Sequence, residues 1–384
     1  FFTSARSAAT PGPEPGEEMR RPGVIISGGG TGGHLYPALV VGRKLLDLAP
    51  GIALTYVGTR REVESRIMAA HGVRFIPMRI EGLKGRGLRS LRGLFVLPLS
   101  FAHSVLILAR TRPALVIGVG GYSSGPIVLL ASWFGIPTVI LEQNARPGFT
   151  NRLLARSVRR AVVAFPSTLP AFKGKGVLLG NPVREEFYGL PAKARGATLD
   201  VLVFGGSQGS HVLNMRMTEA LPLLAAAKGR LRLTHQTGVD DQAAVAAAYR
   251  AAGFDRAEVA AYLPDMAAYF GRADLVVCRA GATTLAELIA ARKASILVPF
   301  AGASEDHQTL NARELASVGG AAVIPEAEAT SAALAARILG FLDRPGEIDA
   351  MERNVARLQI EDPGGRIAAL CLSLMKHSPK ETSA

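Results

Sequence analysis

The chain has 384 residues, of which 48% are hydrophobic and 20% charged, a globular composition at a length that predicts two domains. Its 44 Lys and Arg against 31 Asp and Glu give a net charge of +13, which favours phosphorylated substrates or an anionic membrane surface as partners. Nucleic acid is disfavoured, because only 6% of the residues are aromatic and no zinc finger, basic zipper or aromatic platform is present. The two cysteines, Cys278 and Cys371, are too far apart in sequence to suggest a metal site and fit a reducing compartment.

The first residues lack an initiator methionine and are rich in Ala, Pro, Gly and Ser. They also lack the basic end and apolar block of a signal peptide. We therefore expect Met19 to be the natural start and residues 1–22 to form a disordered N-terminal extension.

A glycine-rich turn, Gly28 to His34, follows the apolar run 24–27 and precedes a helical stretch. Such a turn directs backbone N–H groups and a positive helix end at one point, which predicts an anion site there. The spacing of Gly28, Gly30 and Gly33 also fits the dinucleotide fingerprint. That fingerprint requires an acidic residue about 20 positions on, at the end of the next strand. The next predicted strand, 52–57, ends without an acid, so a nicotinamide or flavin enzyme is disfavoured.

A basic and apolar segment spans residues 79–92, where leucines alternate with arginines and a lysine. This pattern is typical of contact with anionic lipid headgroups. No transmembrane helix is predicted, because the uncharged stretch 93–109 is short and the stretch 113–141 is interrupted by Gly and Pro. The stretch 113–141 is instead predicted to form a strand, a loop, a helix and a second strand. The predicted membrane patch includes Lys84, Arg86, Arg89 and Arg92.

Strand-like runs alternate with helical stretches along the whole chain, which predicts parallel sheets with helical crossovers. A hinge is expected at residues 180–197, and a second glycine turn, Gly205 to Gly209, follows it. We predict an N-terminal domain at 23–179, a C-terminal domain at 180–361 and a last helix at about 362–377. The predicted strands are 24–27, 52–57, 73–78, 114–118, 137–141, 161–164, 177–179, 200–204, 231–236, 258–260, 274–277, 295–299 and 321–324.

Seven motifs occur in a fixed order: Gly28–His34, Gly120–Pro126, Glu142–Asn144, Gly180–Arg184, Gly205–Gly209, Cys278–Glu287 and Asp306–Gln308. In this order and from about Met19 to the last helix, the chain closely resembles the MurG family of peptidoglycan glycosyltransferases. The resemblance implies an α/β chain with the GT-B fold, in which two Rossmann-like, doubly wound parallel-sheet domains face a cleft. It places the acceptor in the first domain and the nucleotide sugar in the second, with the last helix crossing back to the first.

The resemblance also implies an activity. The family transfers N-acetylglucosamine (GlcNAc) from UDP-GlcNAc to undecaprenyl-pyrophosphoryl-muramoyl-pentapeptide, at the C4 hydroxyl of the muramoyl sugar and with inversion, in peptidoglycan and cell-wall synthesis. The expected location is the cytoplasmic side of the cell membrane as a peripheral protein, with other cell-wall synthesis proteins as partners. No cofactor is expected, and no Asp-x-Asp pair for a metal occurs in the chain.

The resemblance assigns donor-binding residues. Arg184 would contact the diphosphate, as its planar fork suits phosphate oxygens, although an arginine in a surface ion pair is the alternative. Ser207 would contact the phosphates, with a plain helix N-cap as its alternative. Glu287 would accept the ribose hydroxyls, and the backbone of Leu263 would read the uracil edge. The remaining members of the predicted UDP-GlcNAc site are Thr31, Gly32, Gly33, Asn144, Ala282, Thr283, Thr284, Leu285, Ala286 and Gln308, among which Asn144 and Gln308 would bind the sugar hydroxyls.

His34 is the candidate general base, because a helix N-terminus disfavours the imidazolium and keeps the ring able to accept a proton. Its alternative role is a hydrogen bond to an acceptor phosphate. The chain has Leu141 before Glu142 where the family commonly has a histidine, which directs acid–base chemistry to His34 and to Glu142. The predicted acceptor loop comprises Gly121, Tyr122 and Ser123.

Trp133, the only tryptophan, matches a family position on the membrane-facing patch, where an amphipathic ring suits an interface; core packing is its alternative.

Two further hypotheses about the function of the whole chain stay open. One is another GT-B enzyme, such as a glycolipid synthase or a UDP-GlcNAc 2-epimerase. The other is a non-catalytic nucleotide-sugar binder, which would not need His34.

Overall fold

The computed structural model describes residues 21–29, 32–59, 62–78 and 88–376. The first part of the chain forms a seven-stranded parallel sheet with the order β3-β2-β1-β4-β5-β6-β7. Its central strands are buried on both faces, as expected for a parallel sheet covered by helices. The strands are β1 (Gly23–Ser27), β2 (Ala53–Gly58), β3 (Arg74–Pro77), β4 (Leu115–Gly118), β5 (Thr138–Glu142), β6 (Arg160–Val163) and β7 (Gly176–Leu178).

The second part of the chain forms a six-stranded parallel sheet with the order β10-β9-β8-β11-β12-β13. Each strand of both sheets overlaps one of the predicted strands, so the predicted alternation is confirmed. The strands are β8 (Leu199–Phe204), β9 (Leu231–Gln236), β10 (Glu258–Ala260), β11 (Leu275–Cys278), β12 (Ser295–Leu297) and β13 (Ala321–Val323).

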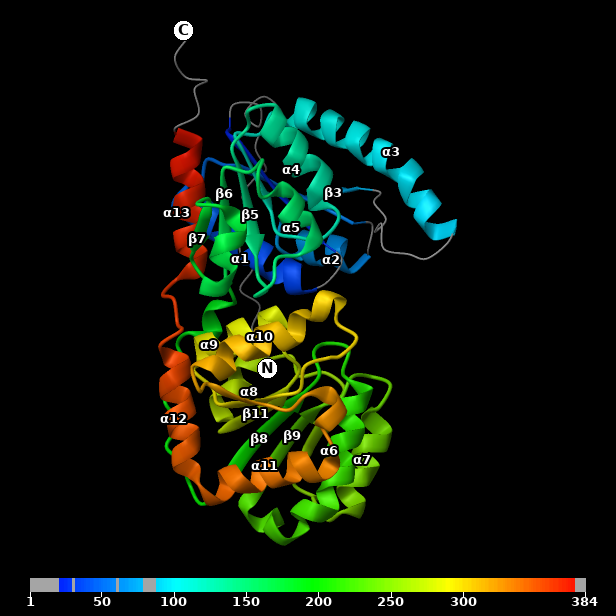
Figure 1. Ribbon diagram of the computed structural model, residues 1–384, viewed down its shortest axis with the longest axis vertical. Helices are drawn as coiled ribbons and strands as arrows, with labels where there is room; N and C mark the ends of the chain where they lie inside the picture. The colour runs from blue at the N-terminus through cyan, green and yellow to red at the C-terminus, as the bar shows by residue number, and fades with distance from the viewer. Residues whose placement is uncertain (1–20, 30–31, 60–61, 79–87, 377–384) are drawn as a thin grey trace, which may run out of the picture.

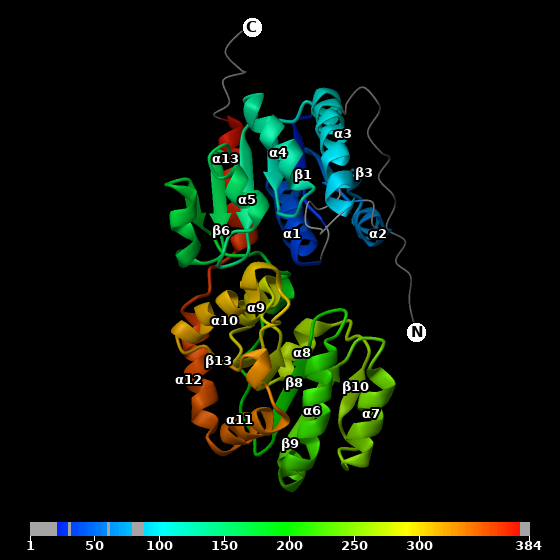
Figure 2. The same ribbon diagram turned by 45° about the vertical axis from the view of Figure 1, so that its right-hand side comes forward.

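Helices cover both faces of the first sheet (Figures 1 and 2). The last helix of the chain, α13 (Pro363–Lys376), lies beside α1, and its Ile367, Ala368 and Cys371 are buried in one core with strands β1 and β4. The predicted return of the last helix to the first sheet is therefore observed. The other helices of this part are α1 (Gly32–Leu48), α2 (Glu62–Ala70), α3 (Leu88–Thr111), α4 (Ser124–Trp133), α5 (Phe149–Leu154) and the 3₁₀ helix η2 (Pro166–Phe172).

Helices pack on both faces of the second sheet in the same way, around two further apolar cores. The α-helices are α6 (His211–Leu224), α7 (Gln242–Ala251), α8 (Met266–Arg272), α9 (Ala282–Ala291), α10 (His307–Ser317), α11 (Ser331–Asp343) and α12 (Pro345–Ala356). Short 3₁₀ helices are η3 (Glu185–Phe187), η4 (Ala225–Arg230), η5 (Ser304–Asp306) and η6 (Glu326–Glu328).

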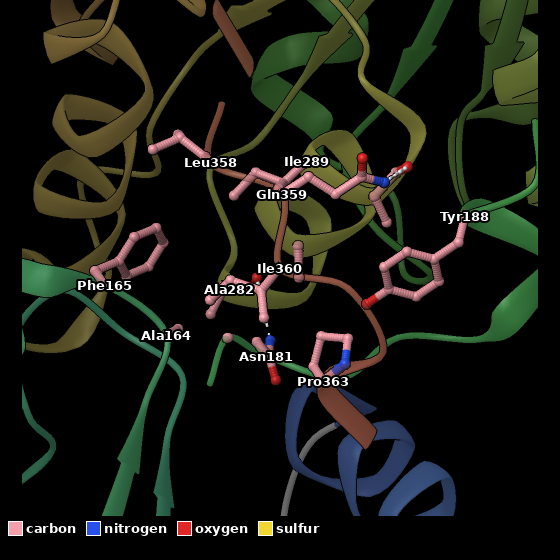
Figure 3. A pocket seen from close by; sticks show the side chains of 13 residues that line it. Ala164, Phe165, Asn181, Tyr188, Ala282, Ile289, Leu358, Gln359, Ile360 and Pro363 are labelled. Carbon is pink, nitrogen blue, oxygen red and sulfur yellow. Dashed lines mark hydrogen bonds between the residues drawn. The ribbon is translucent and has the colours of Figure 1, made fainter. Parts of the chain in front are cut away.

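The chain crosses between the two sheets twice, and the crossings touch. Gly180 has φ +81°, and a Cβ there would lie 3.3 Å from Ile360 and 3.5 Å from Pro363. Asn181 donates to the carbonyl of Ala282 at 3.4 Å, beside a cavity of about 30 Å³ between the crossings (Figure 3). Glycine at position 180 thus allows the two segments to pass in contact.

The end of the predicted hinge is bound to the second sheet. Lys193 forms an ion pair with buried Asp274 at 2.8 Å. Arg195 pairs with Asp349 and Glu352 on α12, each at 2.5 Å. The segment that leaves the hinge is therefore anchored before β8 begins.

Some predictions fall where the structure gives no description. The proposed start at Met19, most of the N-terminal extension, most of the basic segment 79–92 and the tail 378–384 lie outside the described residues. Within the described residues, no helix combines the length and apolar character needed to cross a bilayer.

Candidate functional site

The loops at the carboxyl ends of the two sheets meet each other. Thr283 on α9 donates to the carbonyl of Gly33 on α1 at 3.3 Å. Arg152 on α5 makes a bidentate ion pair with Glu305, with distances of 2.6 and 3.0 Å. We call this contact region, which includes Gly33, Arg152, Thr283 and Glu305, the seam between the two domains. The α/β folds place their ligands at the carboxyl ends of parallel strands, and the seam contains most of the predicted site residues.

The first glycine turn lies against the loop after β4. A Cβ on Gly28 would lie 2.1 Å from Cγ2 of Val119, and one on Gly121 would lie 2.6 Å from the carbonyl oxygen of Gly29. The two loops therefore pack backbone to backbone, which only glycine permits here. Gly32 and Gly33 begin α1 behind this turn, whereas Thr31 lies outside the described residues.

His34 lies in the first turn of α1, and its ring covers Gly120. A Cβ on Gly120 would lie 2.9 Å from Nε2 of His34. Burial lowers the pKa of His34 to about 4, with a smaller lowering from His307, while a hydrogen bond with the backbone of Gly29 acts in the opposite direction. The imidazole is therefore neutral at neutral pH, as the sequence predicted, but the main cause is desolvation of the ring and not the helix end.

The predicted acceptor loop borders the same turn. Ser27 at the end of β1 donates to the carbonyl of Ser123 at 3.2 Å, and Ser124 caps the loop by donating to the carbonyl of Gly121 at 2.9 Å. Tyr122 is half-buried between them. The hydroxyl of Ser123 is buried and has no hydrogen-bond partner among the described residues. The loop thus keeps one buried hydroxyl that a ligand can satisfy.

Arg184 and Glu287 come together from distant parts of the chain. Nη2 of Arg184 lies 4.0 Å from Oε1 of Glu287, and its guanidinium lies 5.6 Å from the ring centre of Tyr36. Burial raises the pKa of Glu287 to about 7, while the positive charge of Arg184 acts to lower it. A cavity of about 540 Å³ opens beside Tyr36 and Arg184 along α1. The predicted ligands of the diphosphate and the ribose are therefore neighbours.

Sequence reasoning missed Tyr36. Its position two residues after His34, on the helix that follows the glycine turn, was the available signal. The tyrosine is partly exposed, and burial together with the nearby carboxylate of Glu287 and with Tyr262 raises its pKa, against the effect of Arg184.

The N-terminus of α9 faces the N-terminus of α1. Helix α9 begins at Ala282, and its Thr283 and Thr284 are half-buried at the seam. The side chains of Leu285 and Ala286 are buried in the second domain's core, and the N–H of Leu285 already donates to the carbonyl of Gly281 at 3.0 Å. Two helix N-termini that converge on one region make it favourable for anions.

The second glycine turn differs from its prediction in one respect. Helix α6 begins at His211, and its N-cap is Ser210, so the interpretation of Ser207 as a plain helix N-cap is wrong. Ser207 is instead exposed in the turn itself. Ser210 accepts a hydrogen bond from Nε of buried Arg279 at 2.9 Å. The sequence alone does not distinguish the two serines, because each follows a glycine of the same turn just before the helix.

The predicted uracil-reading residue already has a partner. The N–H of Leu263 donates to Oε1 of Gln236 at 2.8 Å, and Nε2 of Gln236 donates to the carbonyl of Gly206 at 2.9 Å. Gln236 therefore connects the uracil side of the predicted site to the glycine turn. A uracil edge would have to displace this amide or use the carbonyl of Leu263.

Glu142 is buried and accepts four hydrogen bonds. Its donors are the N–H of Asn144 at 3.0 Å, Nδ2 of Asn144 at 3.3 Å, the N–H of Gly148 at 2.9 Å and Nδ2 of Asn151 at 2.8 Å. Burial raises the pKa of this carboxyl, and the hydrogen bonds oppose the shift. The geometry is that of a carboxylate that fixes the loop after β5.

Gln308 lies in the first turn of α10, across the seam from that loop. Its Oε1 accepts from the N–H of Ala280 at 3.1 Å and from the N–H of Phe300 at 3.0 Å. With both acceptor positions occupied, the group left to meet a sugar hydroxyl is its NH₂ donor.

The predicted membrane patch is described only in part. Trp133 ends α4 with 67% of its surface exposed, so the interpretation of Trp133 as a core residue is wrong. Phe134, which follows α4, and Leu99 on α3 are also exposed, and α3 packs on α4. Lys84 and Arg86 lie outside the described residues, and the side chains of Arg89 and Arg92 in α3 are not described.

The described residues contain no cluster of three or more His, Cys, Asp or Glu side chains suited to holding a metal ion. Both cysteines are buried, unpaired thiols in separate cores.

Family models match both halves of the chain. Residues 24–163 match the glycosyltransferase family 28 N-terminal domain, and residues 200–362 match the glycosyltransferase family 28 C-terminal domain. The first match spans strands β1 to β6 of the first sheet, and the second spans strands β8 to β13 of the second sheet.

Curated relatives match over nearly the whole chain. A protein of Myxococcus xanthus (strain DK1622) is 44% identical over 356 residues, covering 92% of this chain and 93% of the relative. A protein of Anaeromyxobacter dehalogenans (strain 2CP-C) is 45% identical over 358 residues, with the same coverage. Both are named UDP-N-acetylglucosamine–N-acetylmuramyl-(pentapeptide) pyrophosphoryl-undecaprenol N-acetylglucosamine transferase.

Among solved structures, MurG of Acinetobacter baumannii matches with a TM-score of 0.76 and 28% identity, covering 92% of this chain and 100% of that one. A UDP-N-acetylglucosamine 2-epimerase from Listeria monocytogenes matches with a TM-score of 0.66 but only 14% identity, which shows a shared fold alone. The predicted GT-B fold is confirmed. The chain therefore belongs to glycosyltransferase family 28 and, within it, to the MurG family of N-acetylglucosamine transferases.

Proposed function

We propose that the protein transfers GlcNAc from UDP-GlcNAc to the C4 hydroxyl of undecaprenyl-pyrophosphoryl-muramoyl-pentapeptide, in peptidoglycan synthesis. The observation that carries this function is identity of 44–45% over 92% of the chain to transferases named for that reaction. The approach of Arg184 to Glu287 within 4.0 Å fits the donor site that the family resemblance implies. The epimerase and binder alternatives are not favoured.

We assign the donor to the domain formed by residues 180–361 and the acceptor to residues 23–179 together with α13. In this assignment Glu287 accepts the ribose hydroxyls and Ser207 contacts the phosphates. His34 and the loop Gly121 to Ser123 face the acceptor, whereas Gly32 and Gly33 of the α1 turn, together with Asn144, contribute to the UDP-GlcNAc site from the first domain. The hydrogen bond between Thr283 and Gly33 supports this division, because it puts the two half-sites in direct contact.

The reaction breaks the bond between the anomeric carbon and UDP and forms a bond from that carbon to the acceptor oxygen. Negative charge grows on the departing diphosphate, so groups fixed there in advance lower the barrier. Arg184 supplies a guanidinium fork, and the N-terminus of α9 supplies backbone N–H groups. Both lie on the same side of the seam, as stabilisation of one leaving group requires.

The acceptor hydroxyl loses its proton as it attacks. We assign that proton to the imidazole of His34, whose ring is neutral and lies at the edge of the acceptor loop. Glu142, the other candidate, already accepts four hydrogen bonds from its own loop. Its geometry supports a role in holding Asn144 rather than in proton transfer.

We further propose that the basic segment with Lys84, Arg86, Arg89 and Arg92, together with exposed Trp133, holds the protein on anionic lipid at the cytoplasmic side of the membrane. This surface lies on the acceptor domain, where a lipid-linked substrate has to arrive. Contacts with other cell-wall synthesis proteins belong to the same proposal.

The test is incubation of the purified protein with UDP-GlcNAc and a short-chain muramoyl-pyrophosphoryl lipid, followed by mass spectrometry. The expected products are UDP and a lipid heavier by one GlcNAc residue, in equal amounts. Conversion of UDP-GlcNAc to its C2 epimer without acceptor, with UDP still attached or released by water, would identify an epimerase, and binding without turnover would identify a binder.

A further inference from the structure

Asn311 lies at the centre of the seam between the two domains. It is on α10, three residues after Gln308 and therefore on the same side of the helix, and its side chain is fully buried. Its Oδ1 accepts from the N–H of Ala145 at 2.9 Å, while Nδ2 donates to Oδ1 of Asn144 at 3.2 Å and to the carbonyl of Ala280 at 3.3 Å. One side chain thus joins the loop after β5 to the loop after β11.

On the first domain, the position of Asn144 is set from two sides. Glu142 accepts from both the backbone N–H and Nδ2 of Asn144. This leaves Oδ1 of Asn144 directed at Nδ2 of Asn311. The orientation of the Asn144 amide, and so the group it offers to a ligand, depends on both partners.

On the second domain, Ala280 links Asn311 to Gln308. The carbonyl of Ala280 accepts from Asn311, and its N–H donates to Oε1 of Gln308. Asn144 and Gln308 are the two residues proposed to hold the sugar hydroxyls. A continuous set of hydrogen bonds therefore runs from Glu142 to Gln308 through Asn311.

We propose that Asn311 is a positioning residue that sets Asn144 and Gln308 relative to each other, so that recognition of the GlcNAc group depends on contact between the domains. The inference rests on the proposed function. It applies to the sugar and not to UDP, because Asn311 contacts none of Arg184, Ser207, Leu263 or Glu287 in this network. An amide suits the position, since it supplies one acceptor and two donors at once.

The first experiment compares UDP and UDP-GlcNAc binding to Asn311→Ala by calorimetry at pH 8. We expect the dissociation constant for UDP-GlcNAc to rise about tenfold, equivalent to about 1.4 kcal/mol, while that for UDP changes less than about twofold. Asn354→Ala is the matched control. Asn354 lies on α12, away from the seam, and donates to the carbonyl of Gly319 at 3.2 Å. The control should leave both constants unchanged.

Asn311→Asp separates hydrogen bonding from shape. Aspartate keeps the size and the acceptor for Ala145, but it faces Oδ1 of Asn144 and the carbonyl of Ala280 with a second acceptor. We expect it to lose UDP-GlcNAc affinity at least as strongly as Asn311→Ala. Recovery of wild-type affinity in the aspartate variant would overturn the proposal, as would an equal loss for UDP and UDP-GlcNAc.

If Asn311→Ala folds poorly, Asn311→Ser takes its place in the experiments. A double-mutant cycle that combines the Asn311 variant with Asn144→Ala then tests the proposal. If Asn311 acts through Asn144, the double variant with Asn144→Ala should bind UDP-GlcNAc no more than about twofold worse than Asn144→Ala alone. Additive losses would contradict this. If the wild-type protein fails to transfer GlcNAc, the proposed function is refuted. If the wild-type protein transfers GlcNAc normally but the Asn311 variants keep the wild-type ratio of UDP-GlcNAc affinity to UDP affinity, only the role of Asn311 is refuted.

Discussion

Nη2 of Arg184 lies 4.0 Å from Oε1 of Glu287, which connects the segment after the first crossing to the helix that follows β11. In the proposed donor site these side chains bind adjacent parts of UDP, the diphosphate and the ribose. Glu287 is largely desolvated, and the charge of Arg184 offsets only part of that effect on its pKa. The protonation state of Glu287 is therefore part of donor binding.

The affinity for UDP-GlcNAc should depend on pH through Glu287. The free carboxyl has a pKa of about 7, and only its ionised form accepts both ribose hydroxyls. Binding should strengthen as the pH rises towards 7, by up to about tenfold per unit, and level off above it. Calorimetry from pH 5.5 to 8.5 with UDP-GlcNAc measures this, since its esterified diphosphate does not titrate in that range.

Glu287→Gln is the control for this pH dependence. It should bind UDP-GlcNAc more weakly at pH 8 and show a nearly flat profile. In Arg184→Ala the midpoint should move above that of the wild type, because the positive charge that favours the carboxylate is gone. A wild-type profile that is flat across this range would remove Glu287 from the ribose site.

His34→Gln should lower turnover by about 10²–10⁴-fold, the usual contribution of a positioned proton acceptor. Its UDP-GlcNAc affinity should stay near that of the wild type, because the residues assigned to UDP, namely Arg184, Ser207 and Glu287, lie on the other domain. Since the pKa of His34 is about 4, the ring stays neutral between pH 5 and 9. The variant should therefore keep the pH dependence that comes from Glu287. Steady-state kinetics with saturating acceptor tests both points.

Near-normal turnover of His34→Gln would exclude the general-base role. A defect confined to the acceptor KM would instead support the alternative in which His34 binds an acceptor phosphate.

Glu142→Gln should act on stability and sugar binding rather than on proton transfer. Glutamine cannot accept all four hydrogen bonds that converge on this carboxylate, so we expect a loss of about 1–3 kcal/mol in the free energy of unfolding. Chemical denaturation and the UDP-GlcNAc dissociation constant measure the two effects. If stability is unchanged but turnover disappears together with a pH-dependent step, Glu142 is the base.

If the basic segment and Trp133 bind the membrane, changes there should weaken vesicle binding without lowering the turnover of a water-soluble acceptor. Changing Arg86, Arg89 and Arg92 to Ser should weaken binding to anionic vesicles by about 1 kcal/mol per charge. Trp133→Ser should weaken it further, as 67% of that side chain is exposed. Turnover of a water-soluble acceptor should remain normal in each variant. Vesicle flotation that is unchanged and independent of salt would assign this surface to another role.

The sequence predicted all the strands because parallel sheets buried on both faces produce short apolar runs that turn signals separate. It also predicted the return of the last helix, through the resemblance to a known family. The alternative interpretation of Ser207 as the N-cap of α6 is wrong, since Ser207 and Ser210 both satisfy the local preference and only the backbone conformation identifies Ser210 as the cap.

The parts of the site that sequence reasoning missed depend on contacts between domains. Nothing local in the sequence indicates that Arg184 lies over Tyr36 or that Asn311 contacts Asn144. The role of Glu142 was equally hidden, because a motif shows that a carboxylate is present but not which donors surround it. Desolvation, the main cause of the pKa of both His34 and Glu287, likewise requires the packed structure.

In the proposed reaction, the acceptor hydroxyl displaces UDP directly across the seam between the two domains. NMR of the lipid product measures this most directly, through the coupling constant of the new anomeric proton. Since GlcNAc is α-linked in UDP-GlcNAc, a single displacement predicts a β-linked GlcNAc on C4 of the muramoyl sugar. An α-linked product, or GlcNAc released to water in place of a disaccharide, would contradict the account.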